Sequence, residues 1–324
     1  MSTGILYLED EEYERARDSL EAALEKKPDS SALLFHLGRA YAGTRQYAQM
    51  AQAFDRCNEI SHEHYDAIRR LRHRHWSSQH QTGVWFLKSS EPDTAAALAA
   101  FRNATYIRPE AHESMHNLGF LYFQSDSLDA ALNVYARLTD DDPSDREAWL
   151  NRGAVHMLRQ EYHSAAEAYS RLLEYDPYDV GALQNAAAAF EKIGLYADGV
   201  EMYRTILLLH PDNSHAYFNL GHLYLRMGDF ARATEALQQA SNLDPEDTET
   251  RYDLAFLHIL SGRDESALPL LEILSVYLPD DQALWEQLSR IYGDRGLSQR
   301  SHRARLRAEA IATRGAAILL TPEP

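Results

Sequence analysis

The chain has 324 residues, with 32 lysines and arginines against 49 aspartates and glutamates, so its formal charge is −17. A hydrophobic fraction of 45% is ordinary for a globular protein and excludes a disordered or collagen-like chain. No apolar run approaches the roughly 18 to 20 residues of a membrane helix, and the single cysteine excludes an internal disulfide. The acidity argues against nucleic acid or anionic lipid as the main partner.

The prolines reveal a repeat. Six of the eleven prolines follow one another at intervals of 34 residues: Pro109, Pro143, Pro177, Pro211, Pro245 and Pro279. Pro28 fits the same series if thirteen residues are inserted once before Pro109. A fixed period of this length is typical of repeat proteins.

Each period predicts two amphipathic helices. When proline is counted as position 32, positions 4, 7, 8 and 11 form one apolar stripe, and positions 20, 24 and 27 form another. Position 8 is always small: Gly4, Gly38, Gly119, Gly153, Ala187, Gly221, Ala255 and Ser289. A small residue there lets two helices approach closely beside the large residue at position 24. Each unit is therefore a predicted hairpin that buries its apolar faces against its neighbours.

Turn and capping residues divide these helices. Gly228 and Gly262 lie in the turns between the two stripes. Residues that favour helix N-caps follow most of the prolines by two places: Ser30, Asp145, Asp179, Asn213, Asp247 and Asp281. These residues predict where the first helix of each hairpin begins.

This pattern resembles the tetratricopeptide repeat family, whose signature is carried by segments such as 216–224 (AYFNLGHLY) and 148–153 (AWLNRG). The resemblance covers nearly the whole chain. It implies an all-α, right-handed superhelical solenoid of about eight hairpins with a C-terminal cap. In the family register, residues 1–324 form a single solenoid with a partial first repeat 1–30, a repeat 31–64, an inserted helix extension at about 65–77, repeats from 78 to 281 at the 34-residue period, a degenerate capping repeat 282–315 and a tail 316–324.

Three places depart from the family pattern. The chain opens at about position 5 of a repeat, which indicates either a short first helix or upstream residues missing from this sequence. In the third repeat, residues 65–88 keep helical spacing and are predicted to form one long helix, and the turn at 89–93 is two residues longer than the family's. In the last repeat, Ser301 and Arg305 replace apolar residues, which predicts a polar cap.

The resemblance implies that the first helix of each hairpin lines a concave face, where position 6 is open to ligand. This position holds Asn117, Asn151, Asn185, Asn219 and then Asp253. Asparagine can donate to and accept from the backbone of an extended peptide, so the row is a candidate peptide site. The alternative is that asparagine serves hydrogen bonds between repeats.

Aromatic side chains on the same helices are candidate apolar anchors for a partner: Phe120, Phe218, Tyr252 and Phe256. Alternatively, these rings pack between adjacent first helices. Position 2 carries Glu113, Glu147 and Glu249, so the groove is expected to be neutral to acidic. This contradicts the carboxylate-clamp subclass of the family, which uses lysine and arginine at these positions.

A zinc-protease motif also occurs. His112, Glu113 and His116 form H-E-x-x-H, whose two histidines lie one helical turn apart and suit Zn²⁺, with the glutamate as base. The repeat register already explains Met115 and Gly119, however, and no nearby residue offers a third ligand. A zinc metallopeptidase is therefore a remote alternative.

Two basic segments interrupt the acidic chain. Residues 62–80 contain four arginines and five histidines against Glu63 and Asp66, and residues 295–314 contain six arginines against Glu309. A solvated face, pairing with the acidic body, partner docking or a metal site are the possible roles of the first segment.

The sequence thus predicts a non-enzymatic scaffold or adaptor that binds a protein or peptide in its concave groove, without cofactor or metal. The alternative is a structural or self-assembling protein that uses the inserted helix or the solenoid ends. We expect no nucleic-acid partner and no membrane segment. Because no signal peptide opens the sequence, we expect a cytoplasmic protein.

Overall fold

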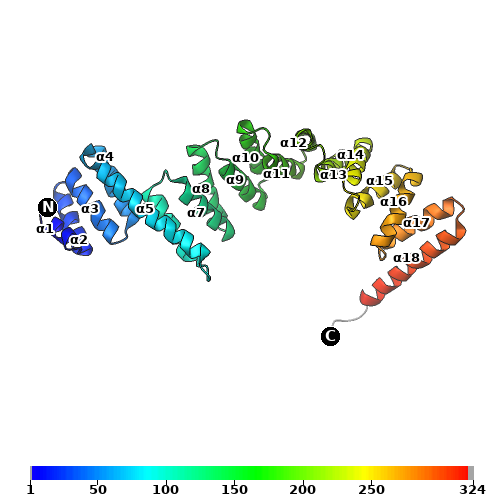
Figure 1. Cartoon of the computed structure of the whole chain (residues 1–324), viewed down its shortest axis with the longest axis horizontal. Helices are drawn as coiled ribbons and strands as arrows, with labels where there is room; N and C mark the ends of the chain where they lie inside the picture. Colours follow the sequence, from blue (N-terminus) through cyan, green and yellow to red (C-terminus); the bar gives the residue numbers. More distant parts are fainter. Residues whose placement is uncertain (1, 320–324) are drawn as a thin grey trace. The chain divides into compact units, whose positions relative to one another are not determined.

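The computed structural model describes residues 2–319, with side chains described for residues 3–314. Over this range the chain forms eighteen α-helices, one short 3-10 helix and no strand, which confirms the all-α prediction (Figure 1). No helix in the same range is both long enough and apolar enough to cross a membrane. The end of the predicted tail, residues 320–324, lies outside the described residues.

The chain divides into two compact units, which we call unit 1 (Met1–Gln160) and unit 2 (Glu161–Pro324). Unit 1 contains α1 (Ser2–Glu9), α2 (Tyr13–Lys26), α3 (Ser31–Gly43), α4 (Tyr47–Ile60), the 3-10 helix η1 (His62–His64), α5 (Tyr65–Lys88), α6 (Thr94–Ile107), α7 (His112–Gln124), α8 (Leu128–Asp141) and α9 (Arg146–Leu158). Unit 2 contains α10 (Tyr162–Tyr175), α11 (Val180–Lys192), α12 (Tyr196–Leu209), α13 (Ser214–Arg226), α14 (Phe230–Leu243), α15 (Thr248–Leu260), α16 (Asp264–Tyr277), α17 (Gln282–Asp294) and α18 (Ser298–Leu319). In the repeat register, odd-numbered helices are first helices and even-numbered helices are second helices. The single solenoid over 1–324 stays a prediction.

The predicted caps form. Side-chain oxygens of six residues accept a hydrogen bond from a backbone N–H in the first turn of the helix that follows: Ser30, Asp145, Asp179, Asn213, Asp247 and Asp281. The equivalent residue before α7 is Ala111, which has no capping side chain. A cap of this kind contributes about 1 kcal/mol to a helix, so the sequence fixes where most first helices begin.

In the hairpins with the regular turn length, one residue of the turn is left-handed, at position 15 of the repeat. In unit 2 this residue is glycine, with φ between 69° and 80° at Gly194, Gly228, Gly262 and Gly296. In unit 1 the same conformation is adopted by other residues, with φ between 57° and 59° at Glu11, Arg45, Asp126 and Gln160. Because a Cβ atom opposes this conformation, unit 1 carries backbone strain that unit 2 avoids.

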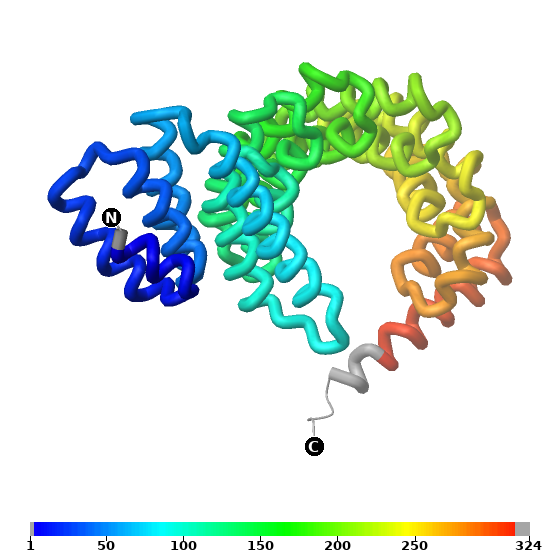
Figure 2. Tube along the Cα trace, turned by 60° about the vertical axis from the view of Figure 1, so that its left-hand side comes forward, coloured from blue at the N-terminus to red at the C-terminus, as the bar shows by residue number. Residues whose placement is uncertain are grey.

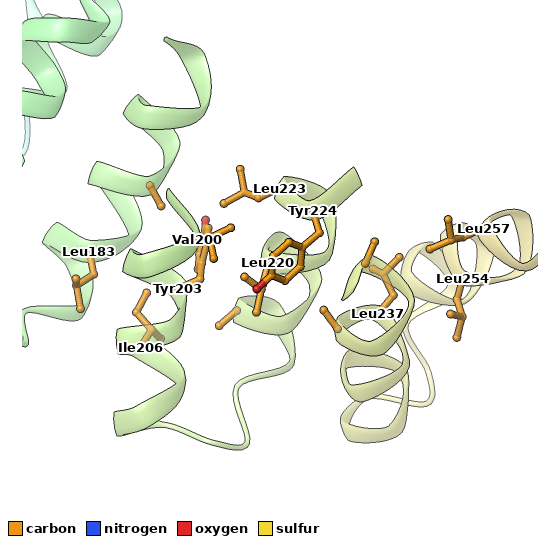
Figure 3. Close-up of a cluster of buried hydrophobic side chains, with 14 residues drawn as sticks. Leu183, Val200, Tyr203, Ile206, Leu220, Leu223, Tyr224, Leu237, Leu254 and Leu257 are labelled. Atoms are coloured by element: carbon orange, nitrogen blue, oxygen red, sulfur yellow. The ribbon is translucent and has the colours of Figure 1, made fainter. Parts of the chain in front are cut away.

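Small residues at position 8 let the two helices of a hairpin meet. A Cβ atom added to Gly221 would lie 2.8 Å from Leu237 Cγ, and one added to Gly38 would lie 2.4 Å from Phe54 Cε1. Both large side chains are fully buried. In unit 2, successive hairpins join through a continuous apolar cluster that runs from Leu183 to Leu257 (Figure 3). The hairpin is thus closed by a small residue against a large one, and the clusters stack the hairpins.

The long third-repeat helix is confirmed: α5 spans Tyr65–Lys88, and residues 89–93 form the longer turn before α6 (Figures 1 and 2). Trp76 Nε1 donates to the buried Ser114 Oγ in α7 at 2.9 Å, and His80 Nδ1 lies 2.9 Å from the same oxygen. These bonds hold the middle of α5 against the next repeat.

Two serines join the helices of the last hairpin, and its role as a polar cap stays a prediction. Ser289 Oγ donates to the Ser301 carbonyl at 3.1 Å, and Ser301 Oγ donates to the Ser289 carbonyl at 2.8 Å. Arg305 is exposed beside the buried Ala304. Helix α18 continues to Leu319, past the predicted end of the capping repeat at 315.

Substituting Gly228 with alanine tests the turn requirement. A Cβ atom at Gly228 meets no heavy atom within 4 Å, so the only cost of Gly228→Ala is the left-handed backbone at φ 76°. We expect the free energy of unfolding to fall by about 1–2 kcal/mol, measured by urea denaturation followed by circular dichroism. Gly293→Ala is the control, because Gly293 is exposed and lies inside α17, where alanine is the better helix former. Equal effects of the two substitutions would contradict the argument.

Candidate functional site: the polar face of the first helices

The candidate site lies on the face of the first helices that is turned away from the core. In unit 2, His222 Nε2 of α13 lies 2.8 Å from Asp253 Oδ2 of α15. His222 is position 9 of its repeat, and Asp253 is position 6 of the next. Position 9 of α13 therefore meets position 6 of α15, and the predicted row lies along the joint between these first helices.

The asparagines of unit 2 are available to a ligand. Asn185 in α11 is exposed and Asn219 in α13 is half-buried, and neither side chain has a hydrogen-bond partner among residues 3–314. Asp253 differs, because its carboxylate is already bonded to His222. The two amides can thus donate and accept, whereas the acid offers mainly charge.

The asparagines of unit 1 differ from each other. Asn117 Nδ2 donates to the Glu113 carbonyl of its own helix at 2.8 Å, which leaves its side-chain oxygen without a donor. Asn151 in α9 is half-buried and makes no side-chain hydrogen bond among the residues with described side chains. The alternative that these asparagines bond between repeats therefore has no support at these positions.

The aromatic candidates divide by exposure. Phe120 in α7 is 46% exposed. Phe218 is half-buried against the unit 2 cluster, and its ring centroid lies 4.4 Å from that of His222. Tyr252 and Phe256 stack at 4.5 Å and pack against the neighbouring cluster. These three rings pack against the core and also reach the surface. Of the four candidates, Phe120 is the one that projects into solvent.

Pairing with Asp253 favours the protonated form of His222. The hydrogen bond that His222 donates to the Asp253 carboxylate raises the pKa of His222 above its ordinary 6.5; burial opposes this shift, and the charges of Asp253, Glu249 and Glu191 add to it. When His222 is protonated, its bond to Asp253 at the end of the asparagine row is charge-assisted.

The histidines of the H-E-x-x-H motif form contacts between helices. His116 Nε2 bonds to Asp145 Oδ2 at 2.8 Å, and the other oxygen of Asp145 caps α9. His112 Nε2 lies 3.7 Å from Asp141 Oδ2. Among the described residues, no group of three or more His, Cys, Asp or Glu side chains is placed to hold a metal ion. The motif residues join α7 to the following helices.

Two residues of this region were missed by the sequence analysis. One is His222, whose pairing with Asp253 joins position 9 of one repeat to position 6 of the next. The other is Ser114, which stands at an x position of H-E-x-x-H. Its buried hydroxyl accepts a hydrogen bond from Trp76 Nε1. A polar residue among the apolar positions of α7 is the one signal that could have indicated it.

Comparison with known proteins matches the chain to one repeat family. Two family models, both described as tetratricopeptide repeat, match the chain, one at residues 194–242 and 224–291 and the other at residues 2–57 and 116–180. Together they cover more than half of the chain. No curated protein matches the sequence.

Solved structures are similar to this chain at low sequence identity. A tetratricopeptide repeat protein from Parabacteroides merdae is 16% identical with a TM-score of 0.52, and the match covers 74% of this chain and 93% of that one. MamA from Desulfovibrio magneticus is 20% identical with a TM-score of 0.47, over 52% of this chain and 96% of that one. YrrB, described as a protein with an unusual peptide-binding site, is 12% identical with a TM-score of 0.45, over 73% of this chain and 98% of that one.

The His222–Asp253 pair predicts a pH dependence. Because the folded-state pKa of His222 is raised, its stabilising effect is fully present below about pH 6.5 and is lost as the pH rises through the raised value. In Asp253→Asn we expect the imidazole titration of His222, followed by NMR, to shift to lower pH. We also expect the stability lost in this variant to be larger at pH 5.5 than at pH 9.

Asp198→Asn is the matched control, because Asp198 is an exposed carboxylate of α12 with no ion pair among the described residues. It removes the same charge without touching the pair and should leave the titration of His222 in place. An unaltered titration in Asp253→Asn would show that Asp253 does not raise the pKa.

Proposed function

Because the chain belongs to the tetratricopeptide repeat family, we propose that it is a non-enzymatic adaptor that binds an extended segment of a partner protein along the polar face of its first helices. The repeats support a protein–protein interaction scaffold. The finer proposal assigns the contact to the row Asn117, Asn151, Asn185, Asn219 and Asp253, with the aromatic side chains beside it.

The free amides of unit 2 carry this proposal. Asn185 and Asn219 occupy the same position of successive first helices and have no intramolecular partner among the residues with described side chains. Each side chain offers donors and acceptors, which is what an extended backbone needs from a groove. Such contacts give affinity without demanding a particular partner sequence.

The aromatic residues would add a shallow apolar wall. Phe218 lies one residue before Asn219, and Tyr252 stacked on Phe256 continues the wall at α15. Because these rings are partly buried, they present faces and edges to a ligand, and little ordering entropy is lost when the ligand binds. In unit 1, Phe120 is the more exposed anchor.

The end of the row at α15 is chemically distinct. The carboxylate of Asp253 is shared with His222, so it would attract a partner's N–H or cation only at the expense of that bond. We therefore assign the strongest backbone contacts to the asparagines and treat Asp253 as the acidic end of the row.

The double variant Asn185→Ala/Asn219→Ala tests the proposal. The partner is first isolated by affinity capture and identified by mass spectrometry, and its binding segment is then titrated by calorimetry. Loss of two or more hydrogen bonds, each worth about 0.5–1.5 kcal/mol, should weaken binding about tenfold or more. The helical content should be unchanged, because neither side chain is bonded within the fold.

Gln239→Ala/Asn242→Ala is the control, since it removes two amides from the second helix α14. It should leave the affinity unchanged. If the asparagine variant binds as tightly as the native chain, the row does not contact the partner, and the self-assembling alternative would then be examined by light scattering.

A further inference from the structure

A basic groove is formed in unit 1 by residues from the start of α5, the end of α4 and the turn between α6 and α7. Its volume is about 520 Å³, in the range of sites that bind ligands. The lining includes Asn58, Tyr65, Ile68 and Glu110, together with the basic residues Arg69, Arg70, Arg72, His73 and Arg108. None of these residues belongs to the asparagine row. The groove is thus a separate feature, and it exists because the third repeat carries an insertion.

One arginine of the groove is fixed by the preceding repeat, through contacts with α4. Arg72 donates to the Ala51 carbonyl at 2.8 Å and to Asp55 Oδ1 at 2.6 Å, and its side chain is only 15% exposed. Its charge is therefore held in place before any ligand arrives. Asp55 is more than half exposed, so it only partly cancels this charge.

A second arginine is fixed from the opposite wall. The guanidinium of Arg108 lies 5.0 Å from the ring centroid of Trp76, and its Nη1 lies 3.2 Å from His73 Nδ1. Trp76 is itself anchored by its bond to Ser114. The chain from Ser114 through Trp76 to Arg108 pre-organises a cation that would otherwise lose rotamer entropy on binding.

Two further arginines are uncommitted. Arg69 is 73% exposed, and its one ionic contact is with the equally exposed Asp66 at 3.9 Å, which is worth little. Arg70 is exposed and has no partner among the residues with described side chains. These two cations are free to pair with an incoming anion.

The groove already accommodates one carboxylate. Glu110 Oε1 accepts from Arg108 Nε at 2.9 Å. Burial opposes the charge of Glu110, yet hydrogen bonds from its own backbone N–H and from Arg108, with the nearby charge of Arg72, lower the pKa of this carboxyl. Glu110 thus shows that the groove stabilises a carboxylate group.

We propose that this groove binds a short acidic segment of a partner protein. Arg69 and Arg70 pair with its carboxylates, Arg72 and Arg108 supply a fixed positive field, and the half-exposed ring of Tyr65 contacts its aliphatic carbons. A long polyanion is disfavoured because the whole chain carries −17. A short peptide feels mainly charges within about 8–10 Å, the screening length in physiological salt, and there the arginines dominate.

Fluorescence anisotropy with a rhodamine-labelled eight-residue peptide containing five glutamates and one leucine tests the proposal on the full chain. A peptide with glutamine in place of every glutamate is the negative control. In Arg69→Gln/Arg70→Gln we expect affinity for the acidic peptide to fall at least tenfold. The melting temperature should not change, because neither arginine has a strong contact within the fold.

Two further variants separate a specific site from general attraction. Arg74→Gln/Arg102→Gln removes two exposed charges from α5 and α6 outside the groove, and its affinity should fall less than threefold. Glu110→Gln removes the competing carboxylate and should strengthen binding about threefold. Equal losses in both double-arginine variants, or equal binding of the glutamine peptide, would overturn the proposal.

Other occupants give different results. Displacement of the peptide by inorganic phosphate at 1 mM would identify a small-anion site and overturn the peptide assignment. Self-association in light scattering that disappears in Arg69→Gln/Arg70→Gln would make a second copy of the chain the occupant, and would also overturn it. Asn185→Ala/Asn219→Ala should leave acidic-peptide binding intact, so failure at the groove is distinguishable from failure of the asparagine row.

Discussion

The contact between a small residue at position 8 and a large residue at position 24 is the constraint on which each hairpin depends. At Gly38 and Gly221 no Cβ atom fits without displacing Phe54 or Leu237. This approach brings the two helices of each hairpin into close contact. Because the contact recurs at a fixed period, position 6 falls on the same side of each first helix relative to position 8. The asparagine row is therefore a consequence of how each hairpin closes.

The sequence predicted the periodic part of the fold well, because that part depends on local chemistry. Caps such as Asp145 and Asn213 act on N–H groups three residues away, and the length of α5 follows from unbroken helical spacing between Tyr65 and Lys88. The contacts of the candidate site were harder to predict. The pairing of His222 with Asp253 joins residues 31 apart, and it depends on how neighbouring hairpins are rotated. That rotation is set by many packed side chains together, and no single residue encodes it.

The H-E-x-x-H segment shows how local spacing can mislead. Two histidines one turn apart satisfy the geometry of a zinc ligand pair, but a metal site also needs a third ligand from elsewhere in the fold. Here the fold supplies acidic partners to the histidines one at a time, with Asp145 facing His116 and Asp141 near His112. Asp145 is in turn committed to capping α9. The same carboxylate thus closes a helix and satisfies a histidine, which is a structural role.

The insertion in the third repeat makes the surface beside α4 positively charged. In regular repeats the end of one hairpin lies against the next first helix. The added residues of α5 instead carry arginines past the end of α4, where Asp55 holds one of them and Trp76 positions Arg108 from the other wall. Arg69 and Arg70 remain without strong partners. The acidic residues of the chain therefore do not neutralise the positive charge of the groove. The groove is therefore a better candidate for a specific ionic contact than any single arginine on the solvated faces of the helices.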